Sequence, residues 1–151
     1  MKREVKIKTD SVELEGSLAV PKNAPGLVIF AHGSGSSRFS PRNVFVAQVL
    51  QDGGIGTLLI DLLTKEEDEV YETRFNIDLL TERLSAVVRW LSKQQATKNL
   101  VVGLFGASTG AASALNVAAE LGPNVAAVVS RGGRPDLAMG KLDMVVSPTL
   151  L

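Results

Sequence analysis

The residues best suited to chemistry lie in the glycine-bounded segment GASTG at residues 106–110. A branched apolar run at residues 100–105 precedes it, and an alanine-rich run at residues 111–121 follows it. This order predicts a buried strand that turns sharply into a helix, with a serine hydroxyl at the corner. The two glycines leave space where a Cβ would collide with the neighbouring strand and helix. We therefore take Ser108 as the candidate nucleophile.

The predicted helix would direct its unpaired N–H groups and the positive end of its dipole at Ser108. An oxyanion that forms beside the serine would be stabilised there. We expect this helix to end at Leu121, because Gly122 suits the C′ position and Pro123 follows it. A glycine-rich turn of this kind can also serve close packing or phosphate binding, so the pentapeptide alone leaves these alternatives open.

Apolar runs that alternate with helical patterns predict the frame around this serine. The predicted strands cover residues 5–9, 12–20, 27–31, 56–61, 100–105 and 125–129, and the predicted helices cover residues 41–52, 74–93 and 111–121. The first two strands alternate polar and apolar residues, which indicates antiparallel pairing, whereas the later runs suit parallel strands covered on both faces. These elements predict an α/β fold, a three-layer α/β/α sandwich with a mostly parallel sheet.

Two local expectations accompany this frame. The helix at residues 41–52 is expected to turn Val46, Val49 and Leu50 toward the sheet. Residues 62–73 are polar, and we expect them to form a mobile loop.

Four chemistry-bearing side chains follow predicted strands, namely His32, Asp61, Ser108 and Arg131. In such sheets ligands bind outside the carboxyl ends of the strands, so we expect these residues near one edge. Asp61 is expected to brace the end of its strand. Arg131 is a candidate to anchor a substrate carboxylate through charge-assisted hydrogen bonds, with a solvated loop as the alternative.

Composition narrows the possible partners. The chain has 151 residues, 45% apolar and 21% charged, which predicts one globular domain over residues 1–151. Sixteen basic and sixteen acidic side chains cancel, so no overall field would recruit nucleic acid or an anionic membrane. The lack of cysteine excludes disulfides, thiolate zinc sites and a cysteine nucleophile, and we predict no metal or cofactor. No signal-peptide core or membrane-spanning run is evident, so we expect a cytoplasmic protein.

With GASTG around Ser108 and the pair His32-Gly33 after the first long buried strand, the chain resembles the α/β-hydrolases, and among them the dienelactone-hydrolase-like group. The resemblance covers essentially the whole sequence in element order. It implies hydrolysis of a small-molecule ester or lactone, with the backbone N–H groups of Ser34 and Thr109 forming the oxyanion hole. It also implies that His32 shapes the loop and can contact substrate, and is not the general base.

The same resemblance implies that an acid and a base follow later strands. His32 is the only histidine, and residues 147–151 look like the start of such a strand. We therefore expect a C-terminally truncated, partial α/β-hydrolase domain that lacks its last strands, with weak or no turnover. Asp136 is an alternative acid, but an acid without its histidine orients nothing. His32 acting as a rescuing base is a further alternative.

Truncation would leave the strand at residues 125–129 at or near a sheet edge. Unpaired backbone groups on such an edge invite pairing with another chain. We expect self-association through this edge or through residues 149–151.

Two other classes of function compete with hydrolysis. A Rossmann-type nucleotide-binding module is suggested by the glycine-rich residues 33–38 after a strand, but Arg38 replaces the third glycine and no lysine stands beside Gly110. A non-catalytic scaffold or an engineered fragment would keep the fold without the chemistry.

Overall fold

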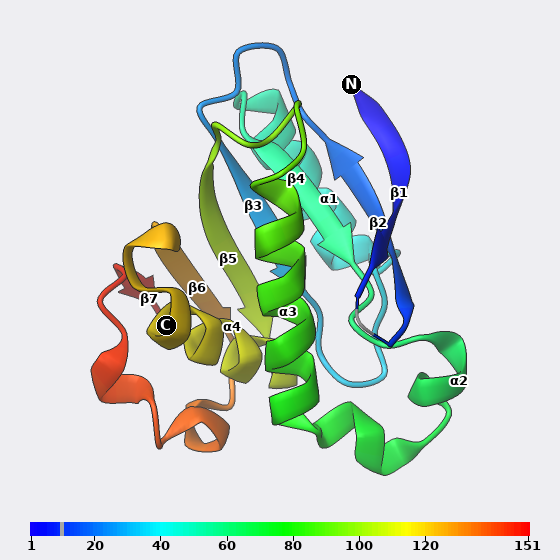
Figure 1. Cartoon of the computed structure of the whole chain (residues 1–151), viewed down its shortest axis with the longest axis vertical. Helices are drawn as coiled ribbons and strands as arrows, with labels where there is room; N and C mark the ends of the chain where they lie inside the picture. Colours follow the sequence, from blue (N-terminus) through cyan, green and yellow to red (C-terminus); the bar gives the residue numbers. More distant parts are fainter. Residues whose placement is uncertain (10) are drawn as a thin grey trace.

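Seven strands form one twisted sheet through the middle of the molecule (Figure 1). The computed structural model describes residues 1–9 and 11–151. The strands are β1 (Lys2–Lys8), β2 (Glu13–Ala19), β3 (Gly26–Ala31), β4 (Gly56–Ile60), β5 (Val101–Ala107), β6 (Ala127–Arg131) and β7 (Thr149–Leu150). Their order across the sheet is β1-β2-β4-β3-β5-β6-β7.

The pairing of these strands confirms the predicted division of the sheet. β1 pairs with β2, and β2 with β4, in antiparallel fashion, whereas β4, β3, β5, β6 and β7 run parallel to one another. The register places Ala31, at the end of β3, beside Ile60 of β4 and Gly106 of β5. The residues that follow these strands therefore emerge at the same edge of the sheet.

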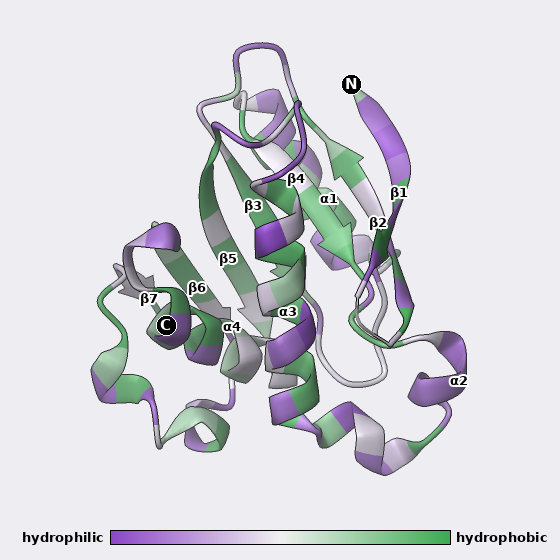
Figure 2. Cartoon of the chain, viewed as in Figure 1, coloured by the Kyte–Doolittle hydropathy of each residue, from purple (hydrophilic) through white to green (hydrophobic). Residues whose placement is uncertain are grey.

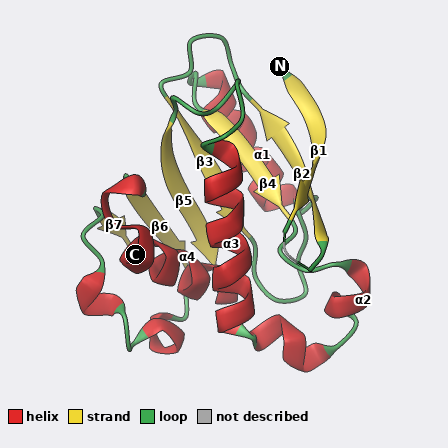
Figure 3. Cartoon of the chain, viewed as in Figure 1, coloured by secondary structure: helices red, strands yellow, loops and turns green. Residues whose placement is uncertain are grey.

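Helices cover both faces of the sheet, as Figure 3 shows. The α-helices are α1 (Pro41–Asp52), α2 (Lys65–Asp68), α3 (Ile77–Leu91) and α4 (Thr109–Leu121), and the 3-10 turns are η1 (Tyr71–Phe75), η2 (Gly122–Asn124), η3 (Pro135–Ala138) and η4 (Leu142–Met144). In Figure 1, α3 and α4 lie in front of the sheet and α1 lies behind it. The predicted three-layer sandwich is confirmed.

The core has two parts, one on each face of the sheet. The central strands are apolar along most of their length (Figure 2). On the face covered by α3 and α4, the strands contribute Ile29, Leu58 and Leu104, all buried. On the other face, Ala47 of α1 packs near Phe30, which is also buried. Burying such side chains stabilises each layer by about 1.5–3 kcal/mol per large apolar residue.

The inward face of α1 differs from the prediction. Asn43 and Ala47 are buried, and Val46 and Leu50 are half-buried against the sheet. Val49 is 53% exposed, so its predicted inward orientation is wrong. The positions that face the sheet, 43, 46, 47 and 50, follow the helical steps of three and four residues, and position 49 lies off this stripe.

Residues 62–73, predicted to be a mobile loop, contain regular structure instead. Thr64 caps α2 and shares a capping box with Glu67, and the spacing of these two residues is a helix-start signal in the sequence itself. The Arg83 guanidinium on α3 holds this segment through the Leu62 carbonyl at 3.0 Å and the Glu67 carboxylate at 2.6 Å. Asn76 then caps α3, which spans less than the predicted 74–93.

The last long strand also begins later than predicted. The 125–129 prediction is corrected to β6, because the Val125 N–H bonds back to the Gly122 carbonyl at 3.1 Å and closes the η2 turn. The predicted helix end is confirmed, since α4 ends at Leu121 and Gly122 has a φ of +53°. None of the helices within the described residues combines the length and apolar character needed to cross a membrane.

We expect self-association through the edge at β7. Within residues 1–9 and 11–151, β7 pairs with β6 on one side only, and nearby Val146, Leu150 and Leu151 are 69%, 68% and 83% exposed. Light scattering at tens of micromolar, where open edges pair, should show a species larger than the monomer. Leu150→Lys should restore the monomer, since a lysine blunts such an edge. A monomeric parent chain would contradict the expectation.

Candidate active site

Ser108 lies at the corner between β5 and α4 in a backbone conformation that L residues rarely adopt. Its φ is +53° and its ψ is −122°. Among the described residues, Asn23 is the other non-glycine residue with positive φ. Such a conformation costs about 1–3 kcal/mol and persists only where the surrounding packing imposes it. The predicted sharp turn at Ser108 is therefore present.

The glycines on either side of Ser108 explain how the corner is imposed. A Cβ on Gly106 would overlap the backbone of Ala111 in α4, and a Cβ on Gly110 would overlap the carbonyl oxygen of Ala31 in β3. A side chain on Gly33 would place its Cβ 2.9 Å from that of Ser108. The loop after β3 therefore passes directly against the serine.

The two predicted oxyanion donors lie around one small hollow. His32, Gly33, Ser34 and Thr109 are among the residues that line a cavity of about 20 Å³. This volume is close to that of a single water-sized probe and suits one oxygen atom. The Ser108 carbonyl accepts the first hydrogen bond of α4, from the Ala111 N–H. The Thr109 N–H comes before this bond and has no acceptor within the helix. The structure thus brings Ser34 and Thr109 together around this hollow, whose described lining does not include Ser108 itself.

His32 has both ring nitrogens occupied. Nδ1 lies 2.9 Å from the Gly33 carbonyl oxygen, and Nε2 lies 3.1 Å from Oδ1 of Asp61. Both partners are acceptors, so both nitrogens act as donors and the imidazolium form is favoured. Burial lowers the pKa of His32, but the Asp61 carboxylate and the Gly33 carbonyl outweigh it, and the pKa is raised from 6.5. His32 in this arrangement offers no lone pair to the Ser108 proton.

Asp61 braces the end of β4, and its partners include Arg38. The Arg38 backbone N–H donates to Oδ1 of Asp61 at 2.8 Å, and the Arg38 guanidinium pairs with Oδ2. Burial raises the pKa of Asp61, but the hydrogen bonds from His32 and Arg38 prevail and hold it below 3.8. The sequence shows no local signal for this pairing, because the two residues lie 23 positions apart.

Arg131 lies away from the hollow. Its guanidinium donates to Oδ1 of Asn43 in α1 at 3.2 Å and lies over the Phe105 ring, 5.6 Å from its centroid. This contact ties the end of β6 to α1, and a role in substrate binding stays a prediction. Asp136, the alternative acid, forms an exposed pair with Arg134 at 2.8 Å.

The segment before α3 contributes two residues to the lining of the hollow that no sequence pattern points to. Asp68 and Arg74 line the hollow with Ser34. Nε of Arg74 donates to the Asp68 carbonyl at 2.8 Å, and Arg74 approaches the loop at Gly35. Recognition of the capping box at residues 64–67 would have placed this segment in regular structure, although not beside Ser108.

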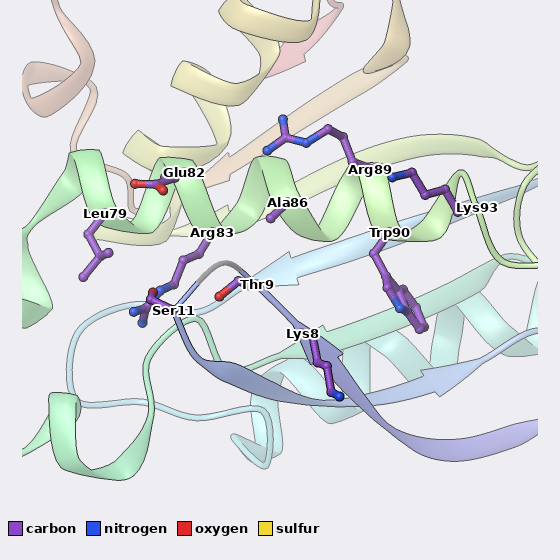
Figure 4. A pocket seen from close by; sticks show the side chains of 10 residues that line it. All are labelled: Lys8, Thr9, Ser11, Leu79, Glu82, Arg83, Ala86, Arg89, Trp90 and Lys93. Carbon is purple, nitrogen blue, oxygen red and sulfur yellow. The ribbon is translucent and has the colours of Figure 1, made fainter.

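A larger groove of about 360 Å³ lies between α3 and the first two strands (Figure 4). Its lining includes Lys8, Arg83, Trp90 and Lys93. Trp90 is half-buried and packs against the core. Among the described residues, the lining of this groove shares no member with the predicted catalytic set, so the groove is separate from the Ser108 site.

Solved structures share this architecture. The chain superposes on dienelactone hydrolase from Anabaena variabilis with a TM-score of 0.95 and 52% identity, covering 99% of this chain and 71% of that one. An esterase from Pyrococcus furiosus matches with a TM-score of 0.74 and 25% identity, covering 88% of this chain and 49% of its own. Est1E from Butyrivibrio proteoclasticus shares the fold at 22% identity and a TM-score of 0.71, over 83% of this chain and 49% of its own.

Curated relatives from two strains of Mycobacterium tuberculosis match as strongly in sequence. Each is 55% identical over 148 residues, or 98% of this chain, and the name of each contains the words phosphoribosyl transferase. The chain spans 33% of the length of these relatives. No family model matches the chain.

The strain at Ser108 predicts a difference between two small substitutions. Ser108→Gly should be more stable than Ser108→Ala by about 1 kcal/mol, because glycine relieves the positive φ at a cost of about 0.5–1 kcal/mol in chain entropy. In thermal melts this corresponds to roughly 2–4 °C for a chain of this size. Equal or lower stability of the glycine variant would show that the corner is unstrained.

Proposed function

The chain belongs to the α/β-hydrolase family, in its dienelactone-hydrolase-like group, and on this premise we propose that it hydrolyses carboxylic ester or lactone bonds through an acyl-enzyme on Ser108. The observation that carries the proposal is the placement of Ser108. Its disfavoured φ of +53° holds the residue at a strand-to-helix corner, against the loop that carries Ser34. A serine in such a corner has its hydroxyl presented at the carboxyl edge of the sheet.

The proposed reaction has two steps. The Ser108 oxygen attacks the carbonyl carbon, and the carbonyl π electrons move to oxygen, where the amides of Ser34 and Thr109 donate hydrogen bonds. The oxyanion collapses and breaks the bond to the leaving oxygen, which takes up one proton as the serine loses one. Water then attacks the acyl-enzyme, releases the acid and restores the serine. A lactone gives one hydroxy acid by the same steps.

The serine proton passes to water in this proposal. His32 is the sole imidazole in the sequence, and its two nitrogens face Gly33 and Asp61. We therefore propose slow turnover for these 151 residues. An oxyanion hole and substrate binding without a full triad retain about 10³–10⁴-fold acceleration over water.

The substrate is proposed to be a small-molecule ester or lactone, on the strength of the similarity to dienelactone hydrolase. The transferase activity in the names of the curated relatives is not part of this proposal. Those names describe proteins of which this chain spans 33%, and the Ser108 corner supports acyl chemistry instead.

A fluorophosphonate probe tests the proposal without knowledge of the natural substrate. The probe should add one adduct to Ser108, slowly because no base assists the serine, and peptide mass spectrometry should locate it; the proposed Ser34 and Thr109 amides favour this site by stabilising the phosphonyl oxygen in the transition state. Hydrolysis of an activated aryl ester should be slower in Ser108→Ala, which loses the nucleophile, but should stay above the solvent rate because the proposed oxyanion donors remain.

The matched control is Ser92→Ala, since Ser92 is an exposed serine beyond the end of α3. This variant should keep the parent rate and the adduct. Equal ester hydrolysis by the parent chain and Ser108→Ala would refute the proposal.

A further inference from the structure

One carboxylate holds both ends of the loop that carries Ser34. At the start of the loop, Nε2 of His32 donates to Oδ1 of Asp61 at 3.1 Å. At its end, the backbone N–H of Arg38 donates to the same oxygen at 2.8 Å, while the Arg38 guanidinium pairs with Oδ2. The two anchor points are six residues apart in the sequence and meet on a single side chain.

Between these anchors the loop forms a tight turn. The Ser36 N–H donates to the Gly33 carbonyl at 3.2 Å, and Gly35 has a φ of +74°, which suits glycine. Gly33 lies against Ser108, so the loop has little room to move toward the serine. The orientation of the Ser34 amide therefore depends on how firmly the two ends are held.

Arg38 links this anchor to the antiparallel strands. Its Nη1 lies 3.2 Å from the Glu15 carboxylate on β2, and its Nε lies 3.4 Å from the Glu4 carboxylate on β1. The Arg38 side chain is 11% exposed, but the Glu4 and Glu15 side chains are 64% and 48% exposed, so solvent screens these two pairs and each adds little. The pair with Asp61 is the main anchor of the Arg38 side chain.

We propose that Asp61 and Arg38 are positioning residues of the hydrolytic site, which hold the 32–38 loop so that the Ser34 amide faces the oxyanion at Ser108. This inference rests on the function proposed above. Neither residue touches the reacting atoms, and both act through the loop. Loss of the anchor would displace a donor whose stabilisation is largest in the transition state.

The hold depends on the charge of His32. The charged groups that act on the imidazole are Asp61 after β4 and Asp68 of α2. Arg38 pairs with the same Asp61, and Arg74 of η1 lines the same hollow as His32. The pKa of His32 is raised in the folded chain. The stability that the charged imidazole adds through Asp61 is therefore fully present below about pH 6.5, and it is lost as the pH rises through the pKa of the folded state. The pKa of Asp61 is lowered, so its contribution is lost only as the pH falls below 3.8.

The first experiment compares Asp61→Asn with Asp136→Asn. Both variants remove one carboxylate that pairs with an arginine, but the Asp136 pair is exposed and outside the loop. Asp61→Asn should slow fluorophosphonate labelling of Ser108 by about tenfold or more, since a displacement of roughly 1 Å can cost about a hundredfold. Asp136→Asn should label at the parent rate. The labelling rate of Arg38→Lys should fall between the other two, because lysine keeps the positive charge but lacks the planar guanidinium with its several donors.

The second experiment uses pH, which separates positioning from a general loss of structure. The single imidazole gives one NMR titration, with a midpoint above 6.5 in the parent chain and a lower midpoint in Asp61→Asn. The ratio of parent to Asp61→Asn labelling rates should fall as the pH rises through the parent midpoint. Taking the ratio cancels the intrinsic ionisation of the serine. A ratio independent of pH would overturn the positioning role.

Hydrogen exchange tests the anchor without any activity. The peptide that covers residues 33–38 should exchange faster in Asp61→Asn than in Asp136→Asn, while the peptide of α4 remains unchanged in both. Equal exchange in the two variants, or faster exchange with unchanged labelling, would overturn the proposal. If the parent chain takes no label, the proposed hydrolase function fails, and the exchange comparison still decides whether Asp61 holds the loop.

Discussion

The close approach of three backbone segments at Ser108 is the constraint on which the rest of the site depends. The end of β5, the first turn of α4 and the loop after β3 meet where Gly33, Gly106 and Gly110 leave no space for a Cβ. A non-glycine residue at a φ of +53° is unfavourable, and it persists because the surrounding elements determine its position. The small side chains of α4 make this possible, since Ala111, Ala112 and their neighbours are completely buried and allow the helix to pack closely on the sheet.

Charge pairs hold the parts of the site that lie outside regular strands. Asp61 joins the two ends of the loop after β3, and Glu67 joins α2 to Arg83 of α3. A buried or half-buried charge is costly unless a partner and hydrogen bonds compensate for it. Each of these carboxylates has several donors, so the edge of the sheet combines an apolar core beneath with a fixed set of charges above.

As proposed, the site would stabilise charge more fully than it moves protons. Thr109 at the start of α4 and Ser34 in the loop line one hollow, whereas acceptors engage both ring nitrogens of His32. This difference follows from the fold, because the strand-to-helix turn at Ser108 supplies backbone N–H donors without any further side chain. A base, in contrast, requires a lone pair aimed at the serine.

Local patterns determined the architecture and the corner. The alternation in β1 and β2, the apolar runs of β3 to β5 and the glycines around Ser108 each act within a few residues, so the sequence by itself predicted them. Tertiary structure decided which polar side chains meet. Asp61 pairs with Arg38 across 23 positions and with His32 across 29, and Arg131 reaches Asn43 across 88. Such contacts depend on the relative placement of whole elements, which periodicity and spacing do not encode.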